Sequence, residues 1–72
     1  MENMRLAYRI RAFRKLKGYT QQQLAEKTGL SLVLIGSIER GNRKATSQII
    51  DKIAAALGVS SQELNPEDEL KG

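Results

Sequence analysis

The sequence contains no cysteine and no histidine, and these absences exclude several kinds of site. Disulfides, thiolate metal ligands and imidazole ligands are all ruled out. Nucleophilic catalysis that depends on Cys or His is excluded for the same reason. Acidic residues such as Glu39 and Asp51 are scattered along a chain that has little length to form a substrate pocket. We therefore expect no enzyme, no cofactor and no metal site.

Long apolar runs are also missing. The run at residues 32–35 is far shorter than the about 20 residues that a transmembrane helix needs. The first residues lack the basic-then-apolar pattern of a signal peptide. We therefore expect a cytoplasmic protein without a membrane association.

The chain is short, and its 72 residues suffice for one domain. A domain of this size is near the limit below which a hydrophobic core is marginally stable, and dimerisation would be one source of added stability. No internal repeat or long linker divides the sequence. We expect one domain at residues 1–65, followed by an acidic, flexible tail at residues 66–72 that begins with Pro66.

The stretch at residues 21–38 has the pattern of two short helices separated by a tight turn. Thr20 and Gln23 have the spacing of a capping box for the first of these helices. Gly29 would end that helix, because glycine adopts a positive φ without steric cost. Ser31 can cap the second helix. Two helices joined so closely must cross steeply, which is the helix-turn-helix arrangement.

In this stretch the sequence resembles the phage-repressor and Cro-like helix-turn-helix domains, also called the XRE family. The resemblance extends over about residues 5–64. It implies an all-α, five-helix, lambda-repressor-like fold in which the second and third helices form the helix-turn-helix. The matching positions are Gln21, Ala25, Gly29, Ile35 and Ile38 within the motif, and Arg14, the ending Ile38-Glu39-Arg40-Gly41 and the segment from Ile53-Ala54 to Leu57-Gly58-Val59 outside it.

An amphipathic helix is expected before the motif. Leu6, Ile10 and Phe13 recur at four- and three-residue spacing, with basic residues between them. This periodicity predicts a helix at residues 5–17 whose apolar stripe forms one wall of the core.

Two further helices are expected after the motif. Thr46 can cap a fourth helix. This helix would bury Ile53, Leu57 and either Ile49 or Ile50. Ser60 and Glu63 have capping-box spacing, which predicts a short fifth helix around residues 61–64.

The formal net charge of +4 is unevenly distributed. Basic residues dominate residues 1–17, and acidic residues dominate residues 62–72. A basic region facing a polyanion would explain this asymmetry, because Lys and Arg at phosphates supply much of the affinity for DNA. Charge on an exposed helix that only keeps a small domain soluble would explain it equally well.

The resemblance implies roles for individual residues. The second helix of the motif would enter the major groove and read base edges. Arg14 and Glu39 match a family ion pair that ties the first helix to the end of the third. The base-facing residues would be Leu32, Val33, Gly36 and Ser37, and the phosphate-contacting residues would be Gln21, Arg14, Asn42, Arg43, Lys44 and Ser47.

The apolar base-facing residues leave three interpretations open. Leu32 and Val33 can pack on thymine methyl groups, while Gly36 lets the backbone approach the DNA and Ser37 supplies a polar contact. Alternatively, Leu32, Val33 and Leu34 form an apolar patch that binds a protein partner. In the third interpretation, Leu34 and one of the other two fold back onto the core.

Together these observations predict a sequence-specific transcriptional regulator. It would bind an inverted repeat in double-stranded DNA as a homodimer, and it would be nucleoid-associated when bound. The alternative is an antitoxin-like or anti-repressor-like interaction module that uses the apolar face of the third helix and has weak or lost DNA binding. The resemblance also implies dimer contacts around the fourth and fifth helices, at Leu57, Val59, Leu64 and neighbouring residues.

Overall fold

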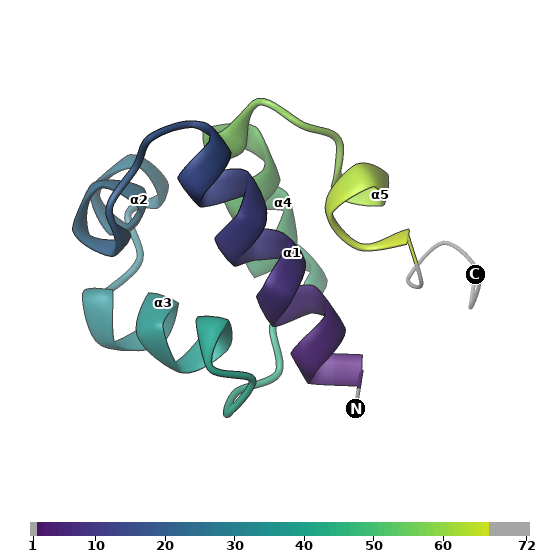
Figure 1. Cartoon of the computed structure of the whole chain (residues 1–72). Helices are drawn as coiled ribbons and strands as arrows, with labels where there is room; N and C mark the ends of the chain where they lie inside the picture. The colour runs from purple at the N-terminus through teal and green to yellow at the C-terminus, as the bar shows by residue number, and fades with distance from the viewer. Residues whose placement is uncertain (1, 67–72) are drawn as a thin grey trace.

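The computed structural model describes residues 2–66, with side chains for residues 4–66. This part of the chain contains five α-helices and no strand (Figure 1). The predicted all-α fold is confirmed. Apart from Pro66, the predicted acidic tail at residues 66–72 lies outside the described residues. The helices are α1 (Glu2–Leu16), α2 (Gln21–Thr28), α3 (Leu32–Glu39), α4 (Ser47–Leu57) and α5 (Ser61–Leu64).

Helices α2 to α5 each begin at a polar N-cap, as predicted. Its side-chain oxygen accepts a hydrogen bond from the backbone N–H three residues later, which otherwise has no acceptor within the helix. At the starts of α2 and α5 the third helical residue returns a bond to the N-cap backbone, so both capping boxes are present. The N-caps are Thr20, Ser31, Thr46 and Ser60, at 3.0, 3.0, 3.2 and 2.9 Å from their donors.

The turn between α2 and α3 is formed at Gly29. This residue has φ 75°, in the left-handed region that glycine adopts without strain, and its N–H donates to the carbonyl of Ala25 at 2.9 Å. In Figure 1, α2 is seen nearly end-on while α3 runs across the view, so the two helices cross steeply. The predicted helix-turn-helix geometry is therefore present.

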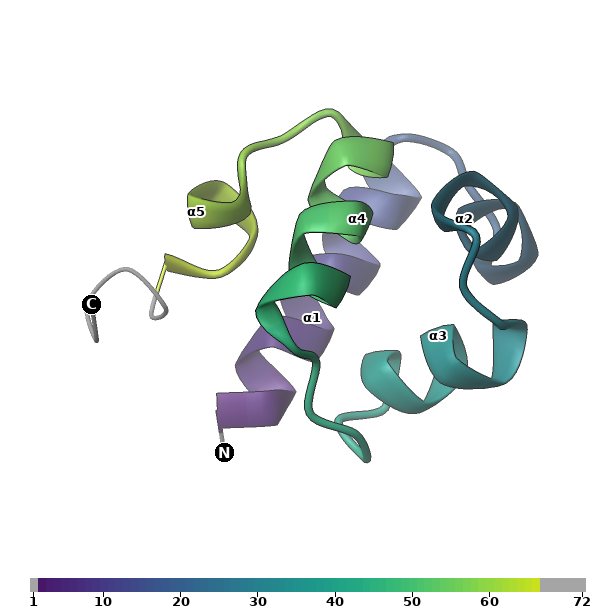
Figure 2. The ribbon, with the colours of Figure 1, turned by 180° about the vertical axis from the view of Figure 1, so that it is seen from behind.

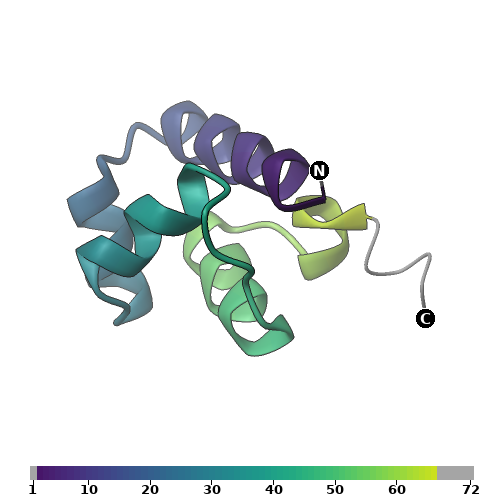
Figure 3. The same cartoon turned by 90° about the horizontal axis from the view of Figure 1, so that it is seen from below.

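The core lies where the five helices meet. Helices α1 and α4 are neighbours, with α2 and α3 on one side of them and α5 on the other (Figures 1 and 2). Both α2 and α1 contact α3, so α3 is held from two sides. Figure 3 shows the segment after α3 returning to the start of α4. The large apolar side chains that are almost fully buried are Ile10, Leu24, Ile35, Ile38, Ile53, Leu57 and Leu64.

Helix α1 differs from the prediction in its bounds and in its buried stripe. It spans Glu2–Leu16 rather than residues 5–17. Leu6, Ile10 and Arg14 are buried at four-residue spacing, whereas Phe13 is only partly buried. Arg14 takes the buried position that was predicted for Phe13, because it has a buried hydrogen-bond acceptor on α3. The spacing of apolar residues does not reveal such an acceptor.

The predicted dimer contacts at Leu57 and Leu64 are wrong. Their side chains are 1% and 0% exposed, because α5 folds back against α4 and α1 and covers them. Val59 is partly buried against the same core. A dimer contact at Val59 or at neighbouring residues of this segment stays a prediction.

Part of the N-terminal positive charge is used inside the domain. The Nε of Arg9 donates to the carbonyl of Leu64 at 3.1 Å, and the Arg9 guanidinium also bonds the carbonyl of Glu63. The same group lies 5.8 Å from the centre of the Phe13 ring. These contacts fasten α5 to α1, so Arg9 has a structural role that neither interpretation of the charge asymmetry included.

In the described residues, no helix is both long and apolar enough to cross a membrane.

Candidate nucleic-acid interface

The outer face of α3 carries two exposed apolar side chains. Leu32 is 46% exposed and Val33 is 78% exposed, although both lie in the first turn of the helix. Leu34 packs partly against the core, and Ile35 is buried. Of Leu32, Val33 and Leu34, only Leu34 packs toward the core. The interpretation in which Leu32 or Val33 also folds back onto the core is therefore wrong. The first turn of α3 presents an apolar surface to the solvent.

Gly36 does not lie open on this face, contrary to its predicted role in a close backbone approach. It is buried, and a Cβ placed on it would be 3.2 Å from Nη1 of Arg40 and 3.8 Å from Oε1 of Gln21. The Arg40 side chain therefore covers the backbone at Gly36. Ser37 is partly buried, and Nη2 of Arg40 lies 3.5 Å from its hydroxyl oxygen.

The predicted ion pair between Arg14 and Glu39 is present and bidentate. The Nε of Arg14 donates to Oε2 of Glu39 at 2.7 Å, and its Nη2 donates to Oε1 at 3.0 Å. Glu39 is 0% exposed and Arg14 is 9% exposed. This planar fork geometry is the strong form of such a pair, and it locks α1 to the end of α3.

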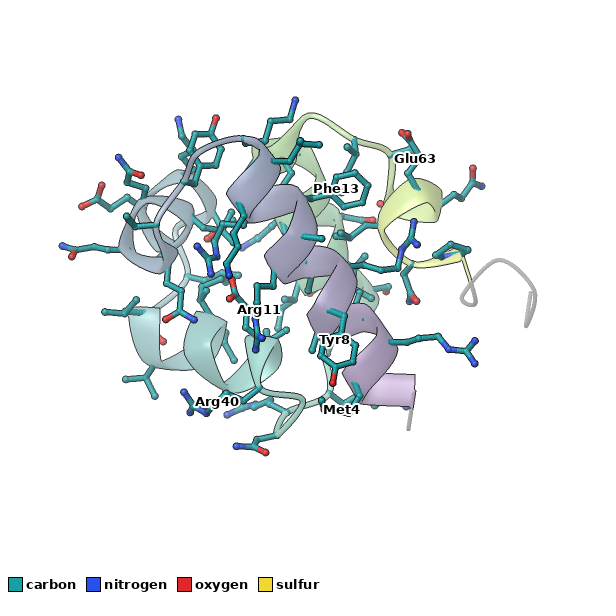
Figure 4. All side chains as sticks on the ribbon, viewed as in Figure 1. Met4, Tyr8, Arg11, Phe13, Arg40 and Glu63 are labelled. Atoms are coloured by element: carbon teal, nitrogen blue, oxygen red, sulfur yellow. The ribbon has the colours of Figure 1, made fainter. Side chains whose placement is uncertain are left out.

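Two more side chains join the same carboxylate. The Nε2 of Gln21 donates to Oε1 of Glu39 at 3.1 Å, which brings in the first residue of α2. The Nη2 of Arg11 donates to the carbonyl of Glu39 at 2.8 Å, and Figure 4 shows Arg11 pointing from α1 toward α3. The Glu39 network, made of Arg11, Arg14, Gln21 and Glu39, thus fixes the relative positions of α1, α2 and α3.

In this structure the side chains of two predicted phosphate contacts, Arg14 and Gln21, bond to groups inside the domain. Nη1 of Arg14 donates to the carbonyl of Tyr19 at 2.8 Å, so all three nitrogens of its guanidinium are bonded inside the domain. Gln21 is partly buried, and its amide holds Glu39. The remaining predicted contacts, Asn42, Arg43, Lys44 and Ser47, are all exposed, between the end of α3 and the first residue of α4.

Arg11 and Arg40 are absent from the predicted site. A signal for each was present in the sequence, because Arg11 precedes Arg14 by three residues and Arg40 follows Gly36 by four. Both spacings place side chains on one helix face.

Among the described residues, no group of acidic side chains is arranged to hold a metal ion.

A known protein family matches most of this domain. Residues 10–64 match the family HTH_3, described as helix-turn-helix, and the match includes α2, α3, α4 and α5 in full. The chain belongs to the HTH_3 helix-turn-helix family. The resemblance to XRE-type domains is thereby confirmed.

Similar proteins come from several bacteria. The chain is 51% identical over 61 residues to the uncharacterised HTH-type transcriptional regulator YazB of Bacillus subtilis, covering 85% of this chain and 88% of YazB. A crystal structure of a hypothetical transcription factor from Neisseria superposes with TM-score 0.87 at 37% identity, covering 99% of this chain and 84% of that one. The restriction-modification controller protein C.AhdI of Aeromonas hydrophila superposes with TM-score 0.84 at 35% identity, covering 86% and 94% of the two chains.

Proposed function

We propose that this chain is a sequence-specific DNA-binding transcriptional regulator that places α3 in the major groove. The observation that carries the proposal is the exposed face of α3, which the crossing of α2 and the Glu39 network hold away from the core. An α-helix with its side chains is about 10–12 Å in diameter, and the major groove of B-DNA, about 12 Å wide, admits it. Relatives named as transcriptional regulators support the same function.

Contacts to the phosphates would flank α3. Arg43 and Lys44 follow α3 directly and are exposed, so they can meet the DNA backbone when α3 occupies the groove. Asn42 lies in the same loop, and Ser47 is the first residue of α4. On the other side of α3, the backbone N–H groups at the start of α2 offer a partial positive charge next to Gln21. These residues would set the position of the domain on DNA without selecting a sequence.

Contacts to the bases would come from the outer face of α3. Leu32 and Val33 are exposed and apolar, which suits van der Waals contact with the C5-methyl groups of thymines. Ser37 would add a hydroxyl that donates or accepts. We propose binding as a homodimer to an inverted repeat, with the two α3 helices about 34 Å apart, one turn of DNA. The protein would then be cytoplasmic and nucleoid-associated.

Selection from a pool of random duplexes at physiological salt tests this function. An enriched palindrome is the expected result, because a two-fold symmetric dimer selects two inverted half-sites. Affinity for the selected duplex should fall steeply as salt rises, since bound cationic side chains release counterions from the DNA. If no duplex is retained at low salt, the proposed function is wrong.

The exposed Leu32 and Val33 also fit the second candidate function, an antitoxin-like or anti-repressor-like interaction module. In that case a protein would cover the start of α3, and retention on duplex DNA would be absent or insensitive to salt. The salt titration therefore separates the two candidates.

A further inference from the structure

The base-facing positions of α3 lack a side chain that forms two hydrogen bonds to one base. Leu32, Val33 and Gly36 form none, and Ser37 has a single hydroxyl. Bidentate hydrogen bonds are the contacts that separate one base pair from another most strongly. If α3 reads a sequence as proposed above, a polar reader from another position on the same face is needed.

Arg40 occupies that position. It is the C-cap of α3 and is exposed, and Figure 4 shows its side chain at the outer edge of α3, pointing away from the body of the domain. Its guanidinium folds back along the helix toward Gly36 and Ser37. Two distances show this direction: Nη1 lies 3.2 Å from the position of a Cβ placed on Gly36, and Nη2 lies 3.5 Å from the hydroxyl oxygen of Ser37.

Gly36 is the residue that allows this conformation. Glycine is unfavourable inside a helix, yet it stands in the middle of α3. A Cβ at this position would lie 3.2 Å from Nη1 of Arg40, closer than ordinary van der Waals contact, so the guanidinium would have to shift by a few tenths of an ångström. The absence of a side chain at Gly36 thus leaves room for the guanidinium beside Ser37.

We propose that Arg40 is a specificity-determining residue that reads a guanine in the major groove, and that Gly36 is the positioning residue that holds it at the level of the base-facing residues. The planar guanidinium donates two parallel N–H bonds and fits the O6 and N7 acceptors of guanine. Gly36 and Ser37 keep it over α3, where base edges would lie, rather than over the loop, where phosphates would lie. This inference rests on the proposed function.

The test compares wild type, Arg40→Ala, Gly36→Ala and the control Arg43→Ala in selection from random duplexes, followed by affinity measurements on the enriched site. Wild type should prefer guanine at one position of each half-site by about 10- to 100-fold over adenine. Arg40→Ala should remove this preference while the other selected positions persist. Arg43→Ala should weaken all duplexes alike and keep the guanine preference.

The variant Gly36→Ala tests whether Gly36 positions the Arg40 guanidinium or has only a structural role in the helix. The added methyl group should displace the guanidinium and lower the guanine preference severalfold. Thermal unfolding should show a midpoint equal to or above wild type, because alanine is the better helix former. A lowered guanine preference without a loss of fold is a result that a merely structural glycine would not give.

Two outcomes contradict the inference, and they are distinguishable. If wild type enriches a sequence but Arg40→Ala weakens every duplex by the same factor, Arg40 contacts a phosphate and the inference alone is wrong. If wild type enriches no sequence at all, the proposed function fails and the inference fails with it.

Discussion

Glu39 is a fully buried carboxylate whose position depends on residues far away in the sequence. Its oxygens accept hydrogen bonds from Arg14 and Gln21, and its carbonyl accepts one from Arg11. Burying a charge is costly unless it is paired and hydrogen-bonded. Among the described side chains, no buried nitrogen or oxygen atom lacks a hydrogen-bond partner, so this cost is offset here.

Arg14→Ala should strongly destabilise the domain. It removes the bidentate partner of the buried Glu39 carboxylate and leaves only the Arg11 guanidinium, whose Nε lies 3.9 Å from Oε1, and the Gln21 amide beside it. The expected loss is up to about 3–5 kcal/mol in the free energy of unfolding. A domain of this length has roughly 4–11 kcal/mol in total, so the loss would be a large part of the stability. Urea denaturation followed by circular dichroism measures the change.

Lys15→Ala is the matched control for that substitution. Lys15 is the next residue on α1, is basic and is exposed, so its replacement should change the stability by less than about 0.5 kcal/mol. Equal effects of the two substitutions would show that the Glu39 network contributes little to folding.

Val33 should matter for recognition and not for folding. It is 78% exposed, so Val33→Ala removes almost no buried area and should leave the midpoint of urea unfolding unchanged. If Val33 contacts one thymine methyl group, discrimination should fall by roughly 1 kcal/mol or less, since good bidentate pairs supply only about 1–3 kcal/mol. An unchanged sequence preference in selection from random duplexes would remove Val33 from the base-facing residues.

At the scale of elements, the loop between α3 and α4 and the start of α4 are held by local bonds. Thr46 caps α4 by accepting from the N–H of Ile49 at 3.2 Å, and Ala45 beside it is buried in the core. The loop is thus anchored at its far end while Arg43 and Lys44 remain exposed. A fixed loop with exposed basic side chains is suited to phosphate contacts.

Thr46→Ala should destabilise the domain by about 1 kcal/mol, because the Ile49 N–H loses its acceptor. Gln48→Ala is the control, since Gln48 is exposed in the first turn of α4 and caps nothing. Chemical denaturation of both variants measures the difference. A loss for Thr46→Ala no larger than that for Gln48→Ala would contradict the role of the cap.

The double variant Arg43→Ala with Lys44→Ala should weaken binding to all duplexes alike. Each lost phosphate contact removes about 0.9 from the slope of log affinity against log salt, so the slope should become shallower by roughly 2. Lys52→Ala, an exposed basic residue of α4 outside this loop, should leave the slope unchanged. Fluorescence anisotropy across a salt series provides the measurement, and equal slopes for all three proteins would exclude the loop from the interface.

At the scale of the whole molecule, the core is small and uses nearly all its large apolar side chains. Leu57 and Leu64 are needed to cover α1 and α4, so they are not available for a partner. Exposed apolar side chains remain at Tyr8 and Leu16 on α1, and at Leu32 and Val33 on α3. In a DNA-bound dimer the last two would be occupied by DNA.

The proposed dimer makes a geometric prediction about its DNA site. Two α3 helices held at a fixed separation should require half-sites about 10 bp apart, centre to centre. Inserting about 5 bp turns one half-site to the opposite face of the duplex and should reduce affinity to that of a single half-site, whereas inserting about 10 bp should restore the facing of the two half-sites. Gel-shift titrations with the three duplexes test this. Equal affinities would show that each domain binds alone.

The sequence by itself determined the starts of α2 to α5 and the turn at Gly29. These features depend on hydrogen bonds between residues two to four positions apart, so Thr20, Gln23 and Gly29 show them directly. The pairing of Arg14 with Glu39 was also predictable, though only through the resemblance to a family.

Only the tertiary structure decided which polar side chains are used inside the domain and which face outward. Gln21 and Arg11 are drawn to Glu39, and Arg40 lies over Gly36, because residues distant in the chain, or a neighbouring turn of helix, supply their acceptors and their space. The burial of Leu64 likewise depends on how α5 folds back against α1 and α4. Helical periodicity shows which residues share a face of a helix. What covers that face is decided by the helices that pack against it.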